Sequence, residues 1–152
     1  MTLYLDHAAT TTIRPEARAA FEDAYDRFDA NASGQHAQAR RAKNALEDAR
    51  ERASEMLGTA SPHDIVFTGS GTESDNLAVV GASLASESTR IAVSAIEHKA
   101  VLLAASSLVR FGYSVDTIPA SPRGVIEPEA AHEAGTDRPG VVSVMLANNE
   151  IG

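Results

Sequence analysis

A glycine-rich turn in the middle of the chain constrains the fold more than any other stretch. Residues 67–76 read FTGSGTESDN; an apolar run at 64–67 leads into them, and a helical pattern leads out. A strand, a glycine-rich turn and a helix start bring free backbone N–H groups and the positive end of a helix dipole to one point. The turn therefore predicts an anion site, and a phosphate group is our first hypothesis for its ligand.

This turn differs from the two best-known phosphate motifs. It lacks the Gly-Lys-Ser/Thr of a P-loop, and it lacks the third glycine of a dinucleotide fingerprint. A purely structural turn is the alternative, with Thr72 as the helix N-cap and Asp75 three residues later. That capping role does not exclude a phosphate contact, because the same hydroxyl and N–H groups point outward.

Strands and helices alternate from residue 64 onward, after two helices and an extended arm. We expect helices over residues 15–29, 36–57, 72–86, about 100–111 and 128–134, and strands over 64–67, 90–95, 113–118 and 141–147. The last strand is continuously apolar, which is typical of a strand buried on both faces. The pattern predicts an α/β fold, a mostly parallel sheet with helices on both faces.

Three polar clusters fall at the predicted carboxyl ends of strands, where sites lie in sheets of this kind. They are Gly69–Asn76, Glu97-His98 and Asn148-Asn149-Glu150. A lone histidine such as His98 is often a surface or packing residue; alternatively its ring stacks on a flat cofactor or acts as an acid or base. The asparagines suit a turn, and they also suit a site that needs amide donors and acceptors.

Composition excludes several classes of function. With 152 residues the chain suits one domain, and a net charge of −8 argues against a nucleic-acid groove. The chain has no cysteine, so it carries no disulfide and no cysteine nucleophile. We expect no metal site, because Asp6-His7 lacks a plausible third ligand. No signal-peptide or membrane-helix pattern is present, and we expect a soluble cytoplasmic protein.

Four motifs in order resemble those of the cysteine desulfurases, the class V aminotransferase-like branch of the fold type I pyridoxal-phosphate enzymes. They read YLDHAATT at residues 4–11, FTGSGTESDN at 67–76, EHKAV at 97–101 and NNEIG at 148–152. The resemblance covers the whole chain. It implies an N-terminal arm over residues 1–14 and, over 15–152, the N-terminal half of the cofactor-binding large domain, incomplete on its own.

The resemblance also implies a cofactor, pyridoxal 5′-phosphate, and a role for each matched residue. Gly71 and Thr72 would bind the phosphate through backbone and hydroxyl groups. His98 would stack on the pyridine ring and help in proton transfer. Asn149 would contact the ring oxygen of the cofactor and lie near the substrate carboxylate, and Asn31 would lie near the substrate.

Two stretches depart from the family pattern. The family loop Asn-Pro-x-Ser-x-x-His is matched loosely by NASGQH, residues 31–36. Leu146 stands where some members of the family have histidine.

Two residues that desulfurases need have no counterpart in this chain. One is the lysine that forms the Schiff base with the cofactor, and the other is the cysteine that carries the persulfide. Neither Lys43 nor Lys99 matches the family lysine. One hypothesis is a split cysteine desulfurase: this chain, inactive alone, works with a complementary chain that carries both residues, as a dimer of such heterodimers acting on L-cysteine. The alternatives are a non-catalytic scaffold or regulatory protein, and a fragment of an ordinary desulfurase or selenocysteine lyase.

Overall fold

A computed structural model describes residues 3–151 of the chain, which divide into two compact units, one up to Phe67 and one from Thr68 onward. Residues 1 and 2 of the predicted arm and Gly152 of the last motif lie outside the described residues. Within residues 3–151, no helix combines the length and the apolar character that crossing a membrane requires.

The first unit contains two α-helices and a short 3-10 helix. The helices are α1 (Pro15–Arg27), α2 (Ala37–Leu57) and η1 (Pro62–Asp64). Proline occupies the first turn of α1, and Gly58 ends α2 in the left-handed conformation at φ 67°, both as the sequence predicts. Before α1, residues 7–9 form a turn and residues 10–14 form neither helix nor strand.

The apolar stripes of α1 and α2 line a hollow of about 660 Å³. Phe21 and Tyr25 of α1 and Leu46 of α2 lie in its wall, and all three are exposed. The two helices bury little of their apolar faces against each other, so the amphipathic pattern predicts the helices correctly and still leaves much of the stripe at the surface.

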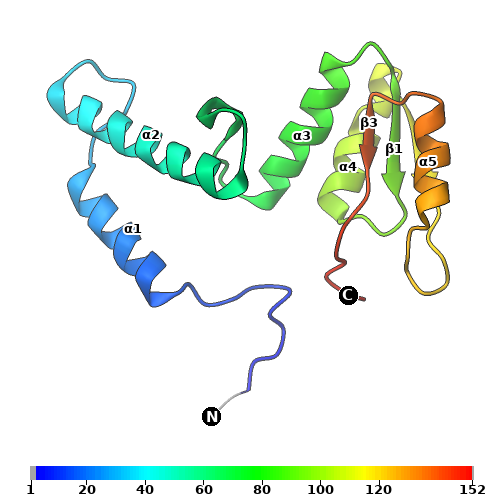
Figure 1. Ribbon diagram of the computed structural model, residues 1–152, viewed down its shortest axis with the longest axis horizontal. Coiled ribbons are helices and arrows are strands. Elements are labelled where there is room, and N and C mark those ends of the chain that lie inside the picture. Colours follow the sequence, from blue (N-terminus) through cyan, green and yellow to red (C-terminus); the bar gives the residue numbers. More distant parts are fainter. Residues whose placement is uncertain (1–2, 152) are drawn as a thin grey trace. The chain divides into compact units, whose positions relative to one another are not determined.

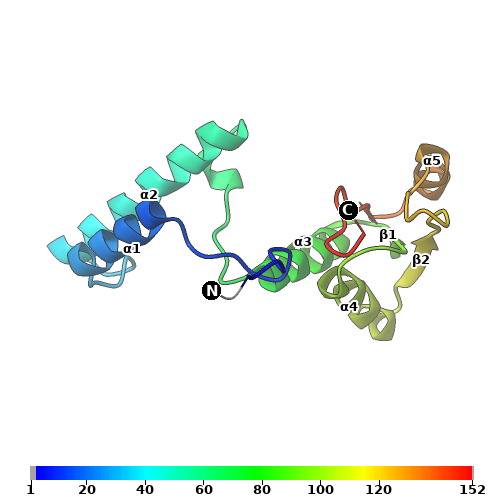
Figure 2. The ribbon, with the colours of Figure 1, turned by 90° about the horizontal axis from the view of Figure 1, so that it is seen from below.

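The second unit is a parallel three-stranded sheet with helices on both faces (Figures 1 and 2). The strand order is β2-β1-β3, and β1 pairs with both neighbours. The elements are α3 (Gly71–Ala85), β1 (Arg90–Ser94), α4 (Lys99–Ser107), η2 (Val109–Phe111), β2 (Ser114–Ile118), α5 (Pro128–Thr136) and β3 (Val141–Ser143). The α/β fold with a parallel sheet is thereby confirmed.

The core of this unit lies between the sheet and the pair α3 and α4. Its buried members are Val79, Ile91, Val93, Val101, Ala104, Ala105 and Leu108. Ile91 and Val93 alternate along β1, so their side chains reach the same face of the sheet. The α5 helix packs on the other face, over β2 (Figure 2).

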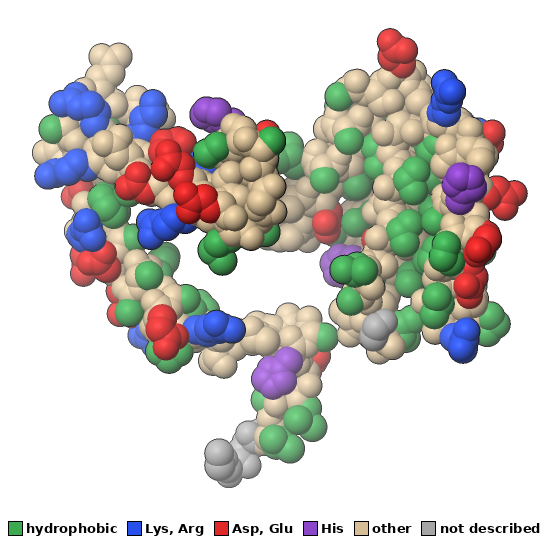
Figure 3. All heavy atoms as spheres, viewed as in Figure 1, with side chains coloured by type: hydrophobic (Ala, Val, Ile, Leu, Met, Phe, Trp, Pro, Cys, Tyr) green, Lys and Arg blue, Asp and Glu red, His purple; other side chains and the backbone are tan. Residues whose placement is uncertain are grey.

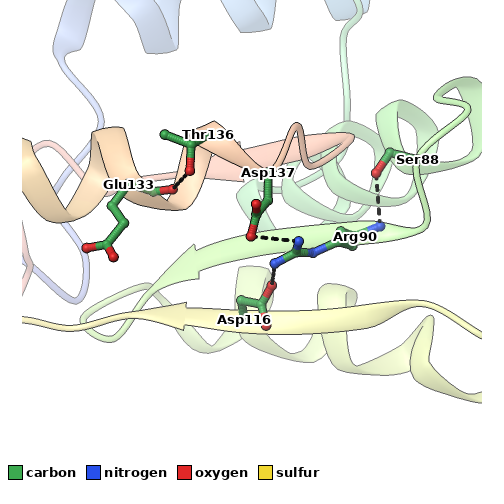
Figure 4. A network of polar contacts seen from close by, with 6 residues as sticks. All are labelled: Ser88, Arg90, Asp116, Glu133, Thr136 and Asp137. Atoms are coloured by element: carbon green, nitrogen blue, oxygen red, sulfur yellow. Dashed lines mark hydrogen bonds and ion pairs between the residues drawn. The ribbon is translucent and has the colours of Figure 1, made fainter.

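Arg90 joins three elements on the α5 face (Figure 4). Its guanidinium group pairs with Asp116 of β2 at 2.8 Å and with Asp137, which follows α5, at 2.9 Å. The hydrogen bond to Asp116, and next the one to Asp137, raise the pKa of Arg90 above its ordinary value. The pairs are solvent-exposed, so they orient α5 against the strands more than they stabilise the fold.

Two predicted strands differ from the structure. Residues 64–67 were expected to form a strand, but η1 occupies the start of this stretch and the rest pairs with no strand among the described residues. The carbonyl group of Ile65 instead accepts a hydrogen bond from the guanidinium group of Arg50, which also lies 5.4 Å from the centre of the Phe67 ring. An apolar run forms a strand only when a neighbouring strand pairs with it.

The predicted strand over 141–147 is shorter and less buried than expected. Only Val141–Ser143 form β3, and Val142 and Val144 are 45% and 43% exposed. Ser143 pairs with Val93, and β1 ends one residue later at Ser94, so residues beyond Val144 have no partner on β1.

Candidate functional site

The glycine-rich turn leads directly into α3, as the sequence predicts, but Ser70 rather than Thr72 is its N-cap. The Ser70 hydroxyl accepts a hydrogen bond from the Glu73 amide at 3.2 Å. The Glu73 carboxylate in turn accepts from the Gly69 amide at 2.7 Å. The reciprocal pair closes two residues earlier than the Thr72–Asp75 alternative, because the glutamate has the reach to return to the turn.

This cap leaves the first turn of α3 open to an anion. Among the described residues, no acceptor takes the backbone N–H of Gly71 or Thr72, and no partner takes the Thr72 hydroxyl. Gly71 has no atom within 4 Å of the position of a Cβ atom, so the space beside it is open. Two free amides, a hydroxyl and the dipole of a 15-residue helix fit a phosphate group.

His98 occupies the second predicted position, where β1 leads into α4. Its Nδ1 atom accepts a hydrogen bond from the Ala100 amide at 3.2 Å, which makes His98 the N-cap of α4. Nε2 has no partner in residues 3–151, and the ring is exposed. The cap holds the ring by one nitrogen while its faces and its second nitrogen stay accessible, which suits a ring that stacks on a ligand.

His98 and Asn149 line one cavity of about 550 Å³. The β1–α4 loop forms one wall of it, and the residues that follow β3 form the other, Lys99 and Glu150 included. The side chain of Asn149 is exposed and has no hydrogen-bond partner among the described residues. Two of the three predicted clusters therefore meet in space. Gly71 and Thr72 do not line this cavity, although α3 belongs to the same unit.

Two residues without a predicted role hold this cavity together. The Glu97 carboxylate accepts hydrogen bonds from Ser94 at 3.2 Å and from Ser143 at 3.0 Å, so it bridges β1 and β3. The side-chain amide of Asn148 donates to the Ile96 carbonyl group at 2.8 Å and ties the chain after β3 to the β1–α4 loop. Both residues belong to motifs noted in the sequence, but only the tertiary structure shows what they contact.

Asn31 lies in the first unit, where its side-chain oxygen accepts a hydrogen bond from the Ser33 amide at 2.9 Å. His36, at the other end of the same loop, caps α2 by accepting from the Ala39 amide at 3.3 Å. Local turn and capping roles account for both contacts, and a substrate role for Asn31 stays a prediction. Within residues 3–151, no group of three or more His, Cys, Asp or Glu side chains is arranged to hold a metal ion.

Comparison with known proteins places these features in a family. The family described as aminotransferase class-V matches residues 3–152. The chain belongs to the class-V aminotransferase family. It is 42% identical to an IscS-like cysteine desulfurase of Mycobacterium tuberculosis, over 98% of this chain and 39% of that protein. The resemblance to the cysteine desulfurases is thereby confirmed, and enzymes of this family depend on pyridoxal phosphate.

Solved structures of similar proteins agree with this membership. A NifS-like protein superposes with a TM-score of 0.89 at 32% identity, over all of this chain and 42% of that one. A protein described as SspA in complex with cysteine gives a TM-score of 0.85 at 33% identity, over 98% of this chain and 43% of that one. The chain is thus a cysteine desulfurase-like segment that spans about two fifths of the length of the relatives it matches.

Proposed function

We propose that this chain is the cofactor-binding part of a cysteine desulfurase, an enzyme that mobilises sulfur from L-cysteine. The observation that carries the proposal is the pairing of an open helix N-terminus at Gly71 and Thr72 with a cavity lined by His98 and Asn149, in a chain of this family. Pyridoxal phosphate has an anionic group, which suits the helix N-terminus, and a flat ring, which suits the cavity.

Each of these residues would have a distinct role toward the cofactor. The amides of Gly71 and Thr72 and the Thr72 hydroxyl would hold its phosphate. His98, oriented by its hydrogen bond with Ala100, would present its ring face to the pyridine ring and its Nε2 atom for proton transfer. Asn149 would donate to the oxygen on the cofactor ring and limit where the substrate carboxylate lies. The bound cofactor supplies the electron sink for the reaction.

We further propose that a second polypeptide supplies the covalent chemistry. The sequence contains no cysteine, and its two lysines are Lys43, on α2, and Lys99, the first residue of α4. A complementary chain that carries the cofactor lysine and the persulfide cysteine would complete the enzyme, and two such heterodimers would assemble, as the sequence predicts. The division into an arm and a half domain, and the cytoplasmic location, likewise stay predictions.

Co-expression with the product of the adjacent reading frame tests this function. We expect a purified complex with the absorbance band of bound pyridoxal phosphate that releases sulfide from L-cysteine in the presence of a thiol reductant, whereas this chain alone releases none. A Thr72→Val variant of the same complex should lose cofactor affinity and keep its stability, because Thr72 is exposed and is not the cap. A complex without the absorbance band would overturn the proposal.

The same preparation distinguishes the alternatives. A scaffold protein derived from this fold would be monodisperse alone and would show no cofactor band of its own. Any activity in the preparation would then come from an added desulfurase. A selenocysteine lyase would release selenide from selenocysteine and little sulfide from cysteine.

A further inference from the structure

A single carboxylate oxygen links the two strands that lead into the walls of the cavity. The Oε1 atom of Glu97 accepts hydrogen bonds from the hydroxyl groups of Ser94, at 3.2 Å, and Ser143, at 3.0 Å. Ser94 is the last residue of β1 and is fully buried, and Ser143 is the last residue of β3 and is half-buried. Because the paired backbone of the two strands ends here, the contact joins the walls at the point where they begin.

The surroundings of Glu97 differ from those of the acidic residues on α5. Glu129 and Glu133 of α5 are exposed, and Figure 3 shows acidic side chains at the surface over this helix. Glu97 is half-buried, and within residues 3–151 no Lys, Arg or His forms an ion pair with it. A half-buried carboxylate needs polar partners, and both of the partners of Glu97 are hydroxyl groups at strand ends. Its role is therefore tied to the geometry of the two strands.

Glu97 also immediately precedes His98, so its position bears on the orientation of the His98 ring. Residues 95–98 connect β1 to α4, and the Glu97 amide donates to the Ser94 carbonyl group at 3.3 Å. The backbone and the side chain of Glu97 thus both return to the end of β1. On its other side, the His98 ring is held by the Ala100 amide at 3.2 Å. The ring is fixed to α4 by its own nitrogen and to the two strands through Glu97.

We propose that Glu97 is a positioning residue for pyridoxal phosphate: its two hydrogen bonds fix the separation of the His98 ring and the Asn149 side chain across the cavity. This inference rests on the proposed function and deepens it. A flat ring bound in the cavity would meet His98 on one wall and Asn149 on the other. Its affinity depends on how closely the separation of these groups is held, and an error of about 1 Å in such a separation is costly. Glu97 acts through these two residues and not on the reacting atoms.

Three variants of the co-expressed complex test this role by titration of the cofactor-free complex with pyridoxal phosphate, followed by absorbance. Glu97→Ala removes both hydrogen bonds and should weaken binding by about tenfold. Glu97→Gln keeps an acceptor oxygen at the same reach, and its amide nitrogen replaces Oε2, which accepts no hydrogen bond from the described residues. It should bind within about twofold of the natural complex. Ser143→Ala removes only the link to β3 and should lie between the two.

A matched control separates positioning from stability. Asp116→Ala also removes a carboxylate that joins two strands, because Asp116 of β2 pairs with Arg90 of β1, but neither residue lines the cavity. Whatever the control costs in melting temperature, it should leave the cofactor affinity unchanged within about twofold. Visible circular dichroism of the bound cofactor gives a second measurement, since it depends on how the ring is seated. We expect it to change in Glu97→Ala and to stay the same in Asp116→Ala and Glu97→Gln.

The outcomes distinguish this inference from the proposed function. If the natural complex binds pyridoxal phosphate and Glu97→Ala binds it equally well, the positioning role is wrong and the proposed function stands. Equal losses of affinity in Glu97→Ala and Asp116→Ala, or in Glu97→Ala and Glu97→Gln, would also overturn the inference. If Glu97→Ala does not fold, Ser143→Ala decides, because it leaves Glu97 bonded to Ser94. If the natural complex binds no cofactor, the proposed function fails and this inference fails with it.

Discussion

Two neighbouring asparagines of the same motif are expected to lose different properties on substitution by alanine: one variant loses stability and the other loses ligand binding. Asn148 makes four side-chain hydrogen bonds. It donates to the Ile96 carbonyl group at 2.8 Å and to the Met145 sulfur at 3.5 Å, and it accepts from the amides of Glu150 at 2.8 Å and Ile151 at 3.1 Å. Asn149 is exposed, and its side chain has no partner within residues 3–151. Asn148→Ala should therefore reduce stability, and Asn149→Ala should reduce only ligand binding.

The magnitude follows from the contacts. Each hydrogen bond contributes about 0.5–1.5 kcal/mol net, and because Asn148 is only half-buried we expect a total loss of about 1–3 kcal/mol. A surface substitution such as Asn149→Ala changes the free energy of unfolding by about 0.5 kcal/mol or less. With a urea m-value of about 1–3 kcal/mol per molar, the Asn148 variant should unfold at roughly 1 M lower urea than the natural chain.

Urea unfolding followed by far-ultraviolet circular dichroism measures the first effect, on the complete chain. Titration of the same samples with pyridoxal phosphate, followed by absorbance, measures the second. We expect Asn149→Ala to weaken cofactor binding by about tenfold, the equivalent of one lost hydrogen bond. Equal urea midpoints for the two variants would refute the structural role of Asn148. Unchanged cofactor affinity in the Asn149 variant would refute its contact with the ring.

Three further substitutions separate packing from binding. Gly71→Ala should leave the free energy of unfolding unchanged or raise it by about 0.4–1 kcal/mol, because no atom lies near the added methyl group. It should still weaken pyridoxal phosphate binding, because the methyl group crowds the phosphate. Lower stability of this variant in urea unfolding would argue against this. Gly140→Ala should destabilise by about 1–3 kcal/mol in the same assay, since its Cβ would lie 2.6 Å from the hydroxyl of Ser86, the residue that follows α3. The control Gly81→Ala meets no atom and should be neutral or stabilising. Arg90→Gln should lower the melting temperature measured by circular dichroism by the same amount at pH 7 and pH 9. Because the pKa of Arg90 is raised, the guanidinium group stays charged, and its contribution to stability is fully present below its ordinary pKa and is lost only in strong alkali. A decrease that differs between the two pH values would contradict this.

Local sequence signals predicted the helices well. Pro15 and Gly58 mark helix ends by backbone geometry alone, and Gly112 ends η2 with φ at 88° as a left-handed residue should. These signals depend on residues within one or two turns of each other, so no tertiary contact is needed to interpret them. The N-cap of α3 was misplaced by two residues because two serine or threonine hydroxyls compete there, and the reach of Glu73 decides between them.

Strand predictions failed where they depended on a partner. The apolar run at 64–67 resembles a strand, but nothing within the described residues pairs with it, and Arg50 takes the carbonyl group of Ile65 instead. The run at 141–147 forms β3 only as far as β1 continues beside it. A strand is a property of two segments, and a single segment cannot show whether its neighbour is present.

The sequence by itself determined the family, the parallel α/β architecture and the residue types suited to a phosphate and a flat ring, because motifs and periodicity are local. The tertiary structure decided which of these residues meet. It brings His98 and Asn149 to one cavity, makes Asn148 and Glu97 the supports of that cavity, and leaves Val142 and Val144 partly exposed. These are contacts between segments about fifty residues apart, set by the register of β1 against β3, and register depends on the packing of the whole unit.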